Sequence, residues 1–305
     1  MSFPAIRPRL RQGRPLVLDS DTGAAFRARG VSLDTPGAVG SLLRSSEAAV
    51  LAHYRAEVKS RVDVLSALTA DTTPRALSEV GMQHRSALLT GRALDLAFEV
   101  AAEASKPVAV AGILGSDMVS PMGADRLEAE LAEHADRIAA AGAELLIARG
   151  QGSRFGLSAA INAATRTGLP TWAVLEALGD SRASSEGAPE ELWAGLIEAG
   201  VGVVLFEVTQ IQAAVVSIER ALAFGLEPRP ALGVLLAGSP HSLLGFPDDD
   251  GDPASWVKAA ADLGDCGARV IGGGAGTTEA HTEALAIALG ELHPSLPVAR
   301  PSESS

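Results

Sequence analysis

The chain has 305 residues, of which 47% are hydrophobic, and a formal net charge of −12. This length suffices for one large domain or two small ones with a substantial core. The negative charge argues against nucleic acid and anionic membranes as partners. A single cysteine, Cys266, excludes an intrachain disulfide and makes a cytoplasmic location the default expectation. No stretch of about 18 residues is apolar enough to span a membrane, and the arginine-rich N-terminus lacks the apolar run of a secretory signal.

One pattern repeats along the chain: a short apolar run, a turn and a longer amphipathic stretch. The apolar runs contain mostly Val, Ile, Leu and Ala without alternation, as expected of strands buried on both faces. In chain order these predicted strands cover residues 15–19, 62–68, 107–113, 143–148, 170–175, 201–206, 231–236 and 268–271. The predicted helices cover residues 40–59, 86–105, 126–141, 156–167, 189–199, 209–224, 254–263 and 278–291.

Eight strands that alternate with eight helices predict a single-domain α/β protein, a (β/α)8 TIM barrel. An open doubly wound sheet is the alternative, but no Gly-x-Gly-x-x-Gly motif follows the first strand. We expect residues 1–13 to form an N-terminal extension, residues 14–295 the barrel domain, and residues 296–305 a disordered tail.

The working residues of such a barrel directly follow its strands. The residues there that we take as site candidates are Asp19, Ser20, Asp21, Thr69, Arg149, Glu176, Glu207, Gly273 and Gly274. Other polar residues of the same loops are Ser116, Asp117, Gln151, Asp180, Ser239 and His241.

Several of these candidates also have a purely structural interpretation. Asp19 and Asp21 could cap a turn, and Thr69 could cap the segment that follows it. The glycine turn at residues 272–277 places backbone N–H groups at a helix N-terminus, where they could bind an anion. Close backbone packing explains the same glycines equally well.

Arg149 ends an apolar strand, where a charge is costly unless it is paired. We expect its guanidinium to face the pocket. Either it binds an anionic ligand, or it pairs with Glu176 or Glu207, which follow the next two strands.

Four segments have the order and spacing of a known set of motifs. They are residues 17–26 (VLDSDTGAAF) followed by Arg29-Gly30, residues 63–69 (DVLSALT), residues 110–123 with the sequence SPMG at its end, and residues 270–278 (VIGGGAGTT) followed by His281. Together they resemble the homocysteine S-methyltransferase family, which includes betaine–homocysteine methyltransferase. The resemblance covers nearly the whole chain and implies a barrel that transfers a methyl group.

The departures from this family concern its metal. The family binds zinc through three cysteines, and zinc lowers the pKa of the homocysteine thiol so that a thiolate attacks. Here the resemblance places Gly274 and Ala275 at the cysteine pair and Val208 at the third cysteine. Cys266 precedes the eighth strand, at the wrong end of the barrel. We therefore predict that the chain has no zinc cofactor. The family's glutamate for the substrate ammonium group corresponds to Arg149, which reverses the charge.

Three hypotheses follow from this pattern. The first is a methyltransferase-like enzyme that acts without zinc on a small molecule with an anionic group, with Asp19 and Glu207 as acid–base residues and Arg149 as a ligand clamp. The second is a non-catalytic relative that binds a ligand or a partner protein. The third is a lyase or hydrolase that uses Glu176 or Glu207. We expect a small-molecule ligand, and any cobalamin would come from a corrinoid or methyltransferase partner protein.

Overall fold

The computed structural model describes residues 2–115, 123–150, 154–176, 189–225, 229–238 and 253–292. Within them, parallel strands form one sheet: β1 (Leu16–Val17), β2 (Val64–Ala67), β3 (Ala109–Leu114), β4 (Leu145–Arg149), β5 (Thr171–Glu176), β6 (Val203–Val208), β7 (Ala231–Leu236) and β8 (Val270–Gly273). Hydrogen-bonded neighbours follow the order β1-β8-β7-β6-β5-β4-β3-β2. A bridge between Leu18 and Val64 joins β1 to β2 and closes the ring. The predicted (β/α)8 barrel is confirmed, and the open-sheet alternative is wrong.

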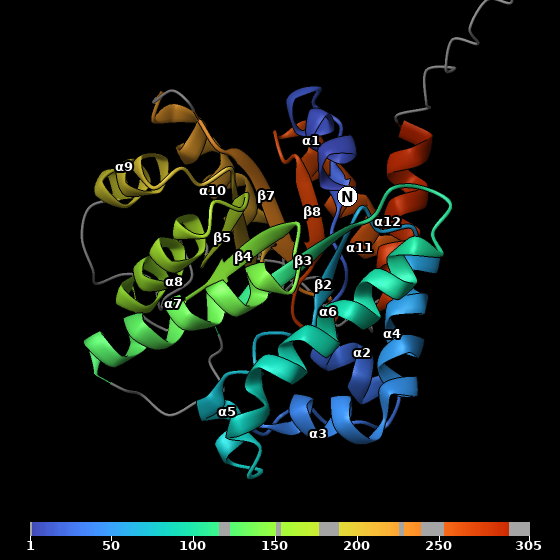
Figure 1. Cartoon of the computed structure of the whole chain (residues 1–305). Coiled ribbons are helices and arrows are strands. Elements are labelled where there is room, and N and C mark those ends of the chain that lie inside the picture. Colours follow the sequence, from blue (N-terminus) through green and yellow to red (C-terminus); the bar gives the residue numbers. More distant parts are fainter. Residues whose placement is uncertain are drawn as a thin grey trace, which may run out of the picture.

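Helices surround the barrel at the predicted places (Figure 1). They are α4 (Glu47–Lys59), α6 (Ser86–Ala102), α7 (Ala124–Ala140), α8 (Arg154–Arg166), α9 (Pro189–Glu198), α10 (Ile211–Ala223), α11 (Pro253–Asp265) and α12 (Glu279–Leu292). Three further helices were not predicted: α1 (Phe3–Arg11), α2 (Thr22–Ala28) and α5 (Pro74–Ser78). The helix predicted over 40–59 is split into α3 (Ala38–Ser45) and α4, because Ser46 has a non-helical backbone with φ −147° and ψ 45°. In the described parts of the chain, no helix is long and apolar enough to cross a membrane.

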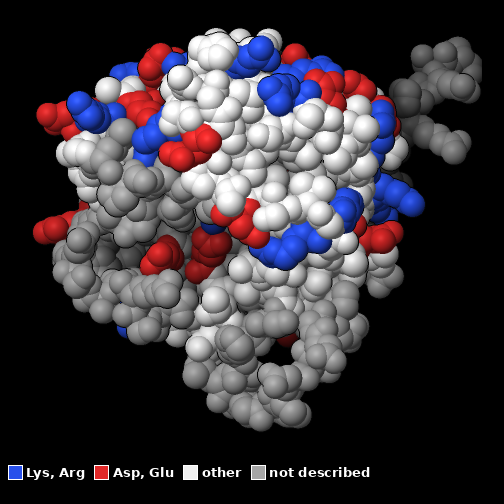
Figure 2. Space-filling model, turned by 90° about the horizontal axis from the view of Figure 1, so that it is seen from below, with Lys and Arg blue, Asp and Glu red and all other residues white. Residues whose placement is uncertain are grey.

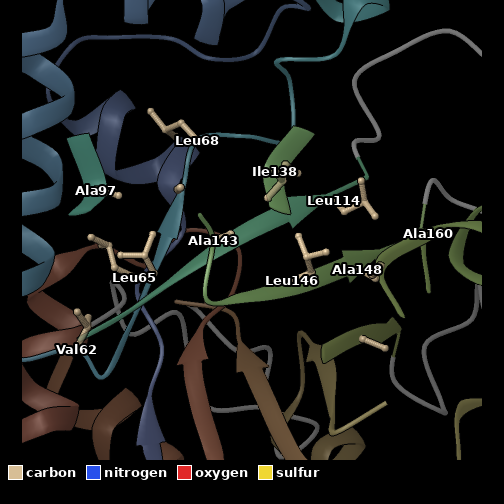
Figure 3. Close-up of a cluster of buried hydrophobic side chains, with 14 of the residues drawn as sticks. Val62, Leu65, Leu68, Ala97, Leu114, Ile138, Ala143, Leu146, Ala148 and Ala160 are labelled. Carbon is tan, nitrogen blue, oxygen red and sulfur yellow. The ribbon is translucent and has the colours of Figure 1, made fainter. Parts of the chain in front are cut away.

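The strands are buried on both faces and separate two hydrophobic layers. Alternate residues point into the barrel, where Leu16, Val64, Leu145 and Trp172 belong to one buried cluster. The other residues point toward the helices and form a larger cluster, in which Leu114 and Leu146 lie near Ile138 of α7, and Leu65 lies near Ala97 of α6 (Figure 3). Burial on both faces explains why the strands appear in the sequence as continuous apolar runs.

Helix α1 packs against the amino-terminal end of the barrel. Its residues Phe3 and Ile6 are 5% and 3% exposed and join the cluster inside the barrel. The ring of Phe3 meets that of Trp172 edge to face, with centroids 6.3 Å apart. The carboxylate of Glu144 accepts hydrogen bonds from the backbone N–H groups of Ser2 and Phe3. The segment predicted as an N-terminal extension therefore contributes to the core.

Candidate functional site

The carboxyl ends of parallel strands lie at one face of a barrel, where the loops after the strands meet. Here that face is the one on which α2, α3 and α5 lie, at the bottom of Figure 1. Figure 2 views the molecule from this side, and acidic side chains are visible in a recess. The rim residues Ser116, Asp117, Gln151, Asp180, Ser239 and His241 lie outside the described residues.

Asp19 follows β1 and is bound to β2. It is 4% exposed. Its Oδ2 accepts a hydrogen bond from the backbone N–H of Ser66 (2.6 Å), and its Oδ1 accepts one from the Ser66 hydroxyl (2.7 Å). Burial raises the pKa of Asp19 to about 6, although the bonds from Ser66 oppose this shift. A carboxyl group with such a pKa can exchange a proton near neutral pH, as general acid–base catalysis requires.

A second buried acid, Glu57 of α4, lies beside Asp19 and was not identified from the sequence. It has no exposed surface, and its Oε1 accepts a hydrogen bond from the Ser20 hydroxyl. Its Oε2 has no hydrogen-bond partner in the described part of the chain. Burial first, and then repulsion by Asp19, raise the pKa of Glu57 to about 8. The predicted residue Ser20 is therefore held by a carboxyl group that is mostly neutral at pH 7.

The polar stripe on α4 that contains Glu57 could have been found from its spacing. His53, Tyr54 and Glu57 are three and four residues apart, so they share one face of the helix, and all three are buried. Burial lowers the pKa of His53 to about 3, so its ring is neutral and packs on Phe26 at a centroid distance of 4.8 Å. The Tyr54 hydroxyl accepts a hydrogen bond from the Leu68 N–H (2.9 Å).

Asp21 links the start of α2 to the glycine turn after β8. Its Oδ1 accepts from the N–H of Gly23 and caps the helix, while its Oδ2 accepts from the N–H of Gly276, each at 2.9 Å. Its own N–H donates to the Thr277 hydroxyl (3.0 Å). The sequence analysis proposed that the N–H groups of the glycine turn could bind an anionic ligand. One of them, the N–H of Gly276, is instead bonded to the carboxylate of Asp21.

The glycines of this turn lie where backbones approach closely. A Cβ on Gly273 would lie 2.1 Å from the Thr277 hydroxyl and 2.8 Å from the Cα of Ser20. A Cβ on Gly274 would lie 2.9 Å from the backbone nitrogen of Ala237, just after β7. Both distances to backbone atoms are too short for a real side chain, so these glycines serve close packing.

Arg149, Glu176 and Glu207 meet at the ends of β4, β5 and β6. The Arg149 Nη2 lies 2.9 Å and 2.7 Å from the two carboxylate oxygens of Glu207. Glu176 is the register partner of Glu207 on the neighbouring strand, and its side chain is exposed. The pairing of Arg149 with one of the two predicted glutamates is thus present. Because Glu207 offsets the charge of Arg149, the rim here carries a formal charge of −1 when both glutamates are ionised.

Thr69 connects the end of β2 to β3. Its hydroxyl donates to the carbonyl of Ile113 and accepts from the N–H of Ile113, each at 2.8 Å. The carbonyl of Thr69 lies 2.8 Å from Nε2 of His134 in α7. Burial lowers the pKa of His134 to about 4, so the ring is a neutral hydrogen-bond partner. Thr69 itself is fully buried, and its hydrogen bonds to Ile113 shape the wall of the rim.

The positions that the resemblance assigns to zinc carry no thiol. Val208 is 1% exposed and packs in the layer between the sheet and the helices. A cysteine at Gly274 would need a shift of the β7 backbone, because its Cβ would lie 2.9 Å from the carbonyl oxygen of Leu235. Cys266 precedes β8 and lies at the other end of the barrel. Within the described residues, no group of three His, Cys, Asp or Glu side chains could hold a metal ion.

Fold and rim together define a class: a (β/α)8 barrel with a polar, largely acidic site at the carboxyl ends of its strands. The sequence model of homocysteine S-methyltransferase matches residues 16–289. The chain therefore belongs to the homocysteine S-methyltransferase family. None of the curated proteins matches it by sequence.

Solved structures of low sequence identity share the fold. The homocysteine methyltransferase MmuM from Escherichia coli, in its metallated form, has a TM-score of 0.76 at 19% identity, over 93% of this chain and 99% of that chain. The apo form of MmuM gives 0.65 at 19% identity, over 92% and 98% of the two chains. A type I 3-dehydroquinate dehydratase from Clostridium difficile gives 0.54 at 10% identity, over 93% and 94%. At these identities the similarity establishes the barrel fold, and the chemical activity has to be inferred from the residues of the site.

Proposed function

We propose that this protein is a methyltransferase-like barrel that acts on a small molecule without the family's zinc site. The observation that supports this is the family match combined with Val208, Gly274 and Ala275, which offer no thiolate. Asp19 and Glu207 are the acid–base candidates. The substrate-binding candidates around them are Ser20, Asp21, Thr69, Arg149, Glu176 and the turn with Gly273 and Gly274.

Without a metal, a nucleophile must lose its proton to a side chain. Asp19 suits this task, because a pKa of about 6 allows proton transfer near neutral pH. Glu207 is less available as a base, since Arg149 contacts both of its carboxylate oxygens. In this proposal a cobalamin, if one is used, is supplied by a partner protein, and the protein works in the cytoplasm.

The Arg149–Glu207 pair gives the site a means to select substrate charge. An anionic substrate group would take the place of Glu207 on the guanidinium, whereas an ammonium group would take the place of Arg149 on the carboxylate. Arg149→Gln should therefore weaken binding of anionic compounds, and Glu207→Gln should weaken binding of cationic ones. A screen of small carboxylates, thioethers and amines by melting temperature measures this preference, since ligands that bind the native state raise it.

Zinc content and thiol methylation test the proposal directly. Elemental analysis of the purified protein should find far less than one zinc ion per chain, and methyl transfer to homocysteine should be absent with or without added zinc. One tightly held zinc per chain together with zinc-dependent methylation of homocysteine would contradict the proposal.

A non-catalytic ligand-binding relative is the second candidate, and the contact of Arg149 with both oxygens of Glu207 favours it. The two candidates differ in turnover. If Asp19→Asn keeps ligand binding but abolishes conversion of the ligand, the site is catalytic. If the wild-type protein binds a ligand but does not convert it when a methyl donor or a corrinoid partner protein is added, the protein is a non-catalytic ligand-binding relative.

A further inference from the structure

A cavity of about 280 Å³ opens at the face opposite the candidate site. This basal cavity lies where β1, β2 and β3 begin, next to α1 and to the carboxyl-terminal half of α12, the face at the top of Figure 1. Four cationic residues line it: Arg9, Arg14, Arg61 and Lys106. Asp63 is the one acidic residue in its described lining, and Ala286 and Leu289 of α12 add an apolar wall.

The carboxylate of Asp63 is already fully engaged. It is 1% exposed, and its Oδ1 accepts from Nη1 of Arg9 (2.5 Å) and from Nζ of Lys106 (2.7 Å). Its Oδ2 accepts from the backbone N–H of Val17 (2.9 Å). One negative charge is thus shared between two cations, while a third cation, Arg61, lines the same cavity. Burial lowers the pKa of Lys106, and repulsion by Arg9 and Arg61 adds to the shift.

The backbone at Arg61 adds an independent observation. Its φ is +68°, and it is the one non-glycine residue with a positive φ among the described residues, beside eleven glycines. Arg61 follows the end of α4, a position at which glycine is the usual residue because a Cβ is strained there. Its side chain forms no ion pair within the described residues. An arginine at a strained backbone position, with its side chain lining a cavity, indicates that the guanidinium has a functional role there.

We propose that the basal cavity binds a small polyanion that carries phosphate or carboxylate groups. Arginine and lysine side chains that converge on a cavity recognise such groups through charge-assisted hydrogen bonds. The chain as a whole carries a charge of −12, so a local excess of cations is not a consequence of its composition. The volume is suited to a small metabolite, and the apolar wall on α12 can contact its carbon skeleton. This site is separate from the rim and does not depend on the proposed function.

Pyrophosphate and citrate are suitable probes, because one carries phosphate groups and the other carboxylates. Each is titrated into the full chain at constant ionic strength, set with potassium chloride, while the melting temperature is recorded. We expect a saturable increase with at least one probe, since a ligand of the native state stabilises it. An increase with pyrophosphate alone assigns phosphate, an increase with citrate alone assigns carboxylate, and equal increases assign the charge shared by both.

Variants locate the site. Arg61→Gly suits the left-handed backbone, so the unliganded variant should melt no lower than the wild type, yet its apparent affinity should fall about tenfold or more. Lys106→Gln should weaken binding similarly. The exposed Arg166→Gln is the matched control, because Arg166 lines neither the basal cavity nor the rim, and it should keep the full response. The proposal is overturned if neither probe raises the melting temperature, if Arg61→Gly keeps the wild-type affinity, or if Arg166→Gln loses the response.

Discussion

Replacing Glu57 by glutamine should change how the stability of this protein depends on pH. Glu57 is completely buried, and its pKa is raised from 4.5 to about 8. In the unfolded chain the carboxyl group loses its proton near pH 4.5, whereas in the folded chain it keeps the proton up to about pH 8. The folded state therefore binds more protons between these values, and the free energy of unfolding must fall as the pH rises through this window.

The size of this effect follows from the shift. One pKa unit corresponds to 1.36 kcal/mol, so the wild type should lose roughly 3–5 kcal/mol of stability between about pH 4.5 and pH 9 through Glu57. Glutamine has the same shape, can still accept the hydrogen bond from Ser20, and does not ionise. Glu57→Gln should therefore have a flatter pH profile and, at pH 9, a higher free energy of unfolding than the wild type. Asp19 repels Glu57, so the difference between the two profiles reports the titration of this pair of carboxyl groups.

Urea unfolding followed by far-ultraviolet circular dichroism, at several pH values from 5 to 9, measures these profiles. Glu128→Gln is the control, because Glu128 is an exposed glutamate on α7 and its replacement should leave the profile unchanged. Parallel profiles for the wild type and Glu57→Gln would refute the reasoning, since they would mean that Glu57 has the same pKa in both states.

Four other outcomes are expected. Asp19→Asn should abolish turnover while keeping the fold, because the amide cannot take up a proton; an unchanged rate would remove Asp19 from catalysis. Arg149→Gln should change the free energy of unfolding by about 1 kcal/mol or less, because the side chains of Arg149 and Glu207 are 36% and 37% exposed; a loss of several kcal/mol, which we would expect of a buried pair, would contradict this. Gly274→Ala should destabilise by about 1–3 kcal/mol, since its Cβ meets the backbone near β7, whereas Gly195→Ala on α9 has open space and serves as the control in the same urea assay. Phe3→Ala should cost about 3 kcal/mol or more, because α1 packs on the barrel core; a change below about 1 kcal/mol would show that α1 is dispensable.

The barrel could be predicted from the sequence because its strands and long helices repeat a simple pattern. Short helices such as α1 and α5 could not, since one or two turns give little periodicity and α1 contains Pro8. The break at Ser46 was missed although residues 44–47 (RSSE) interrupt the apolar pattern and serine is a preferred residue at a helix start.

The pair Arg149 and Glu207 could be predicted from the sequence, whereas the pair Glu57 and Ser20 could not. Arg149 and Glu207 follow strands, so the barrel topology alone predicts that they lie at one rim. Glu57 lies in a helix, and its partner Ser20 is 37 residues away, so their contact depends on how α4 packs. Only the helical spacing of His53, Tyr54 and Glu57 could have indicated that α4 presents polar side chains to the interior.

The link between β1 and β2 depends on carboxylates at both of its ends. At one end the carboxylate of Asp63 accepts the N–H of Val17, while its own N–H donates to the carbonyl of Val17 (2.8 Å). At the other end Asp19 accepts the N–H of Ser66, and one bridge between Leu18 and Val64 lies between the two ends. Two side chains thus supplement a short set of backbone bonds here, whereas the other seven pairs of strands are held by backbone ladders. Because both carboxylates act on one seam, replacing either of them should weaken the same pair of strands, whereas the other pairs are held by their own backbone ladders.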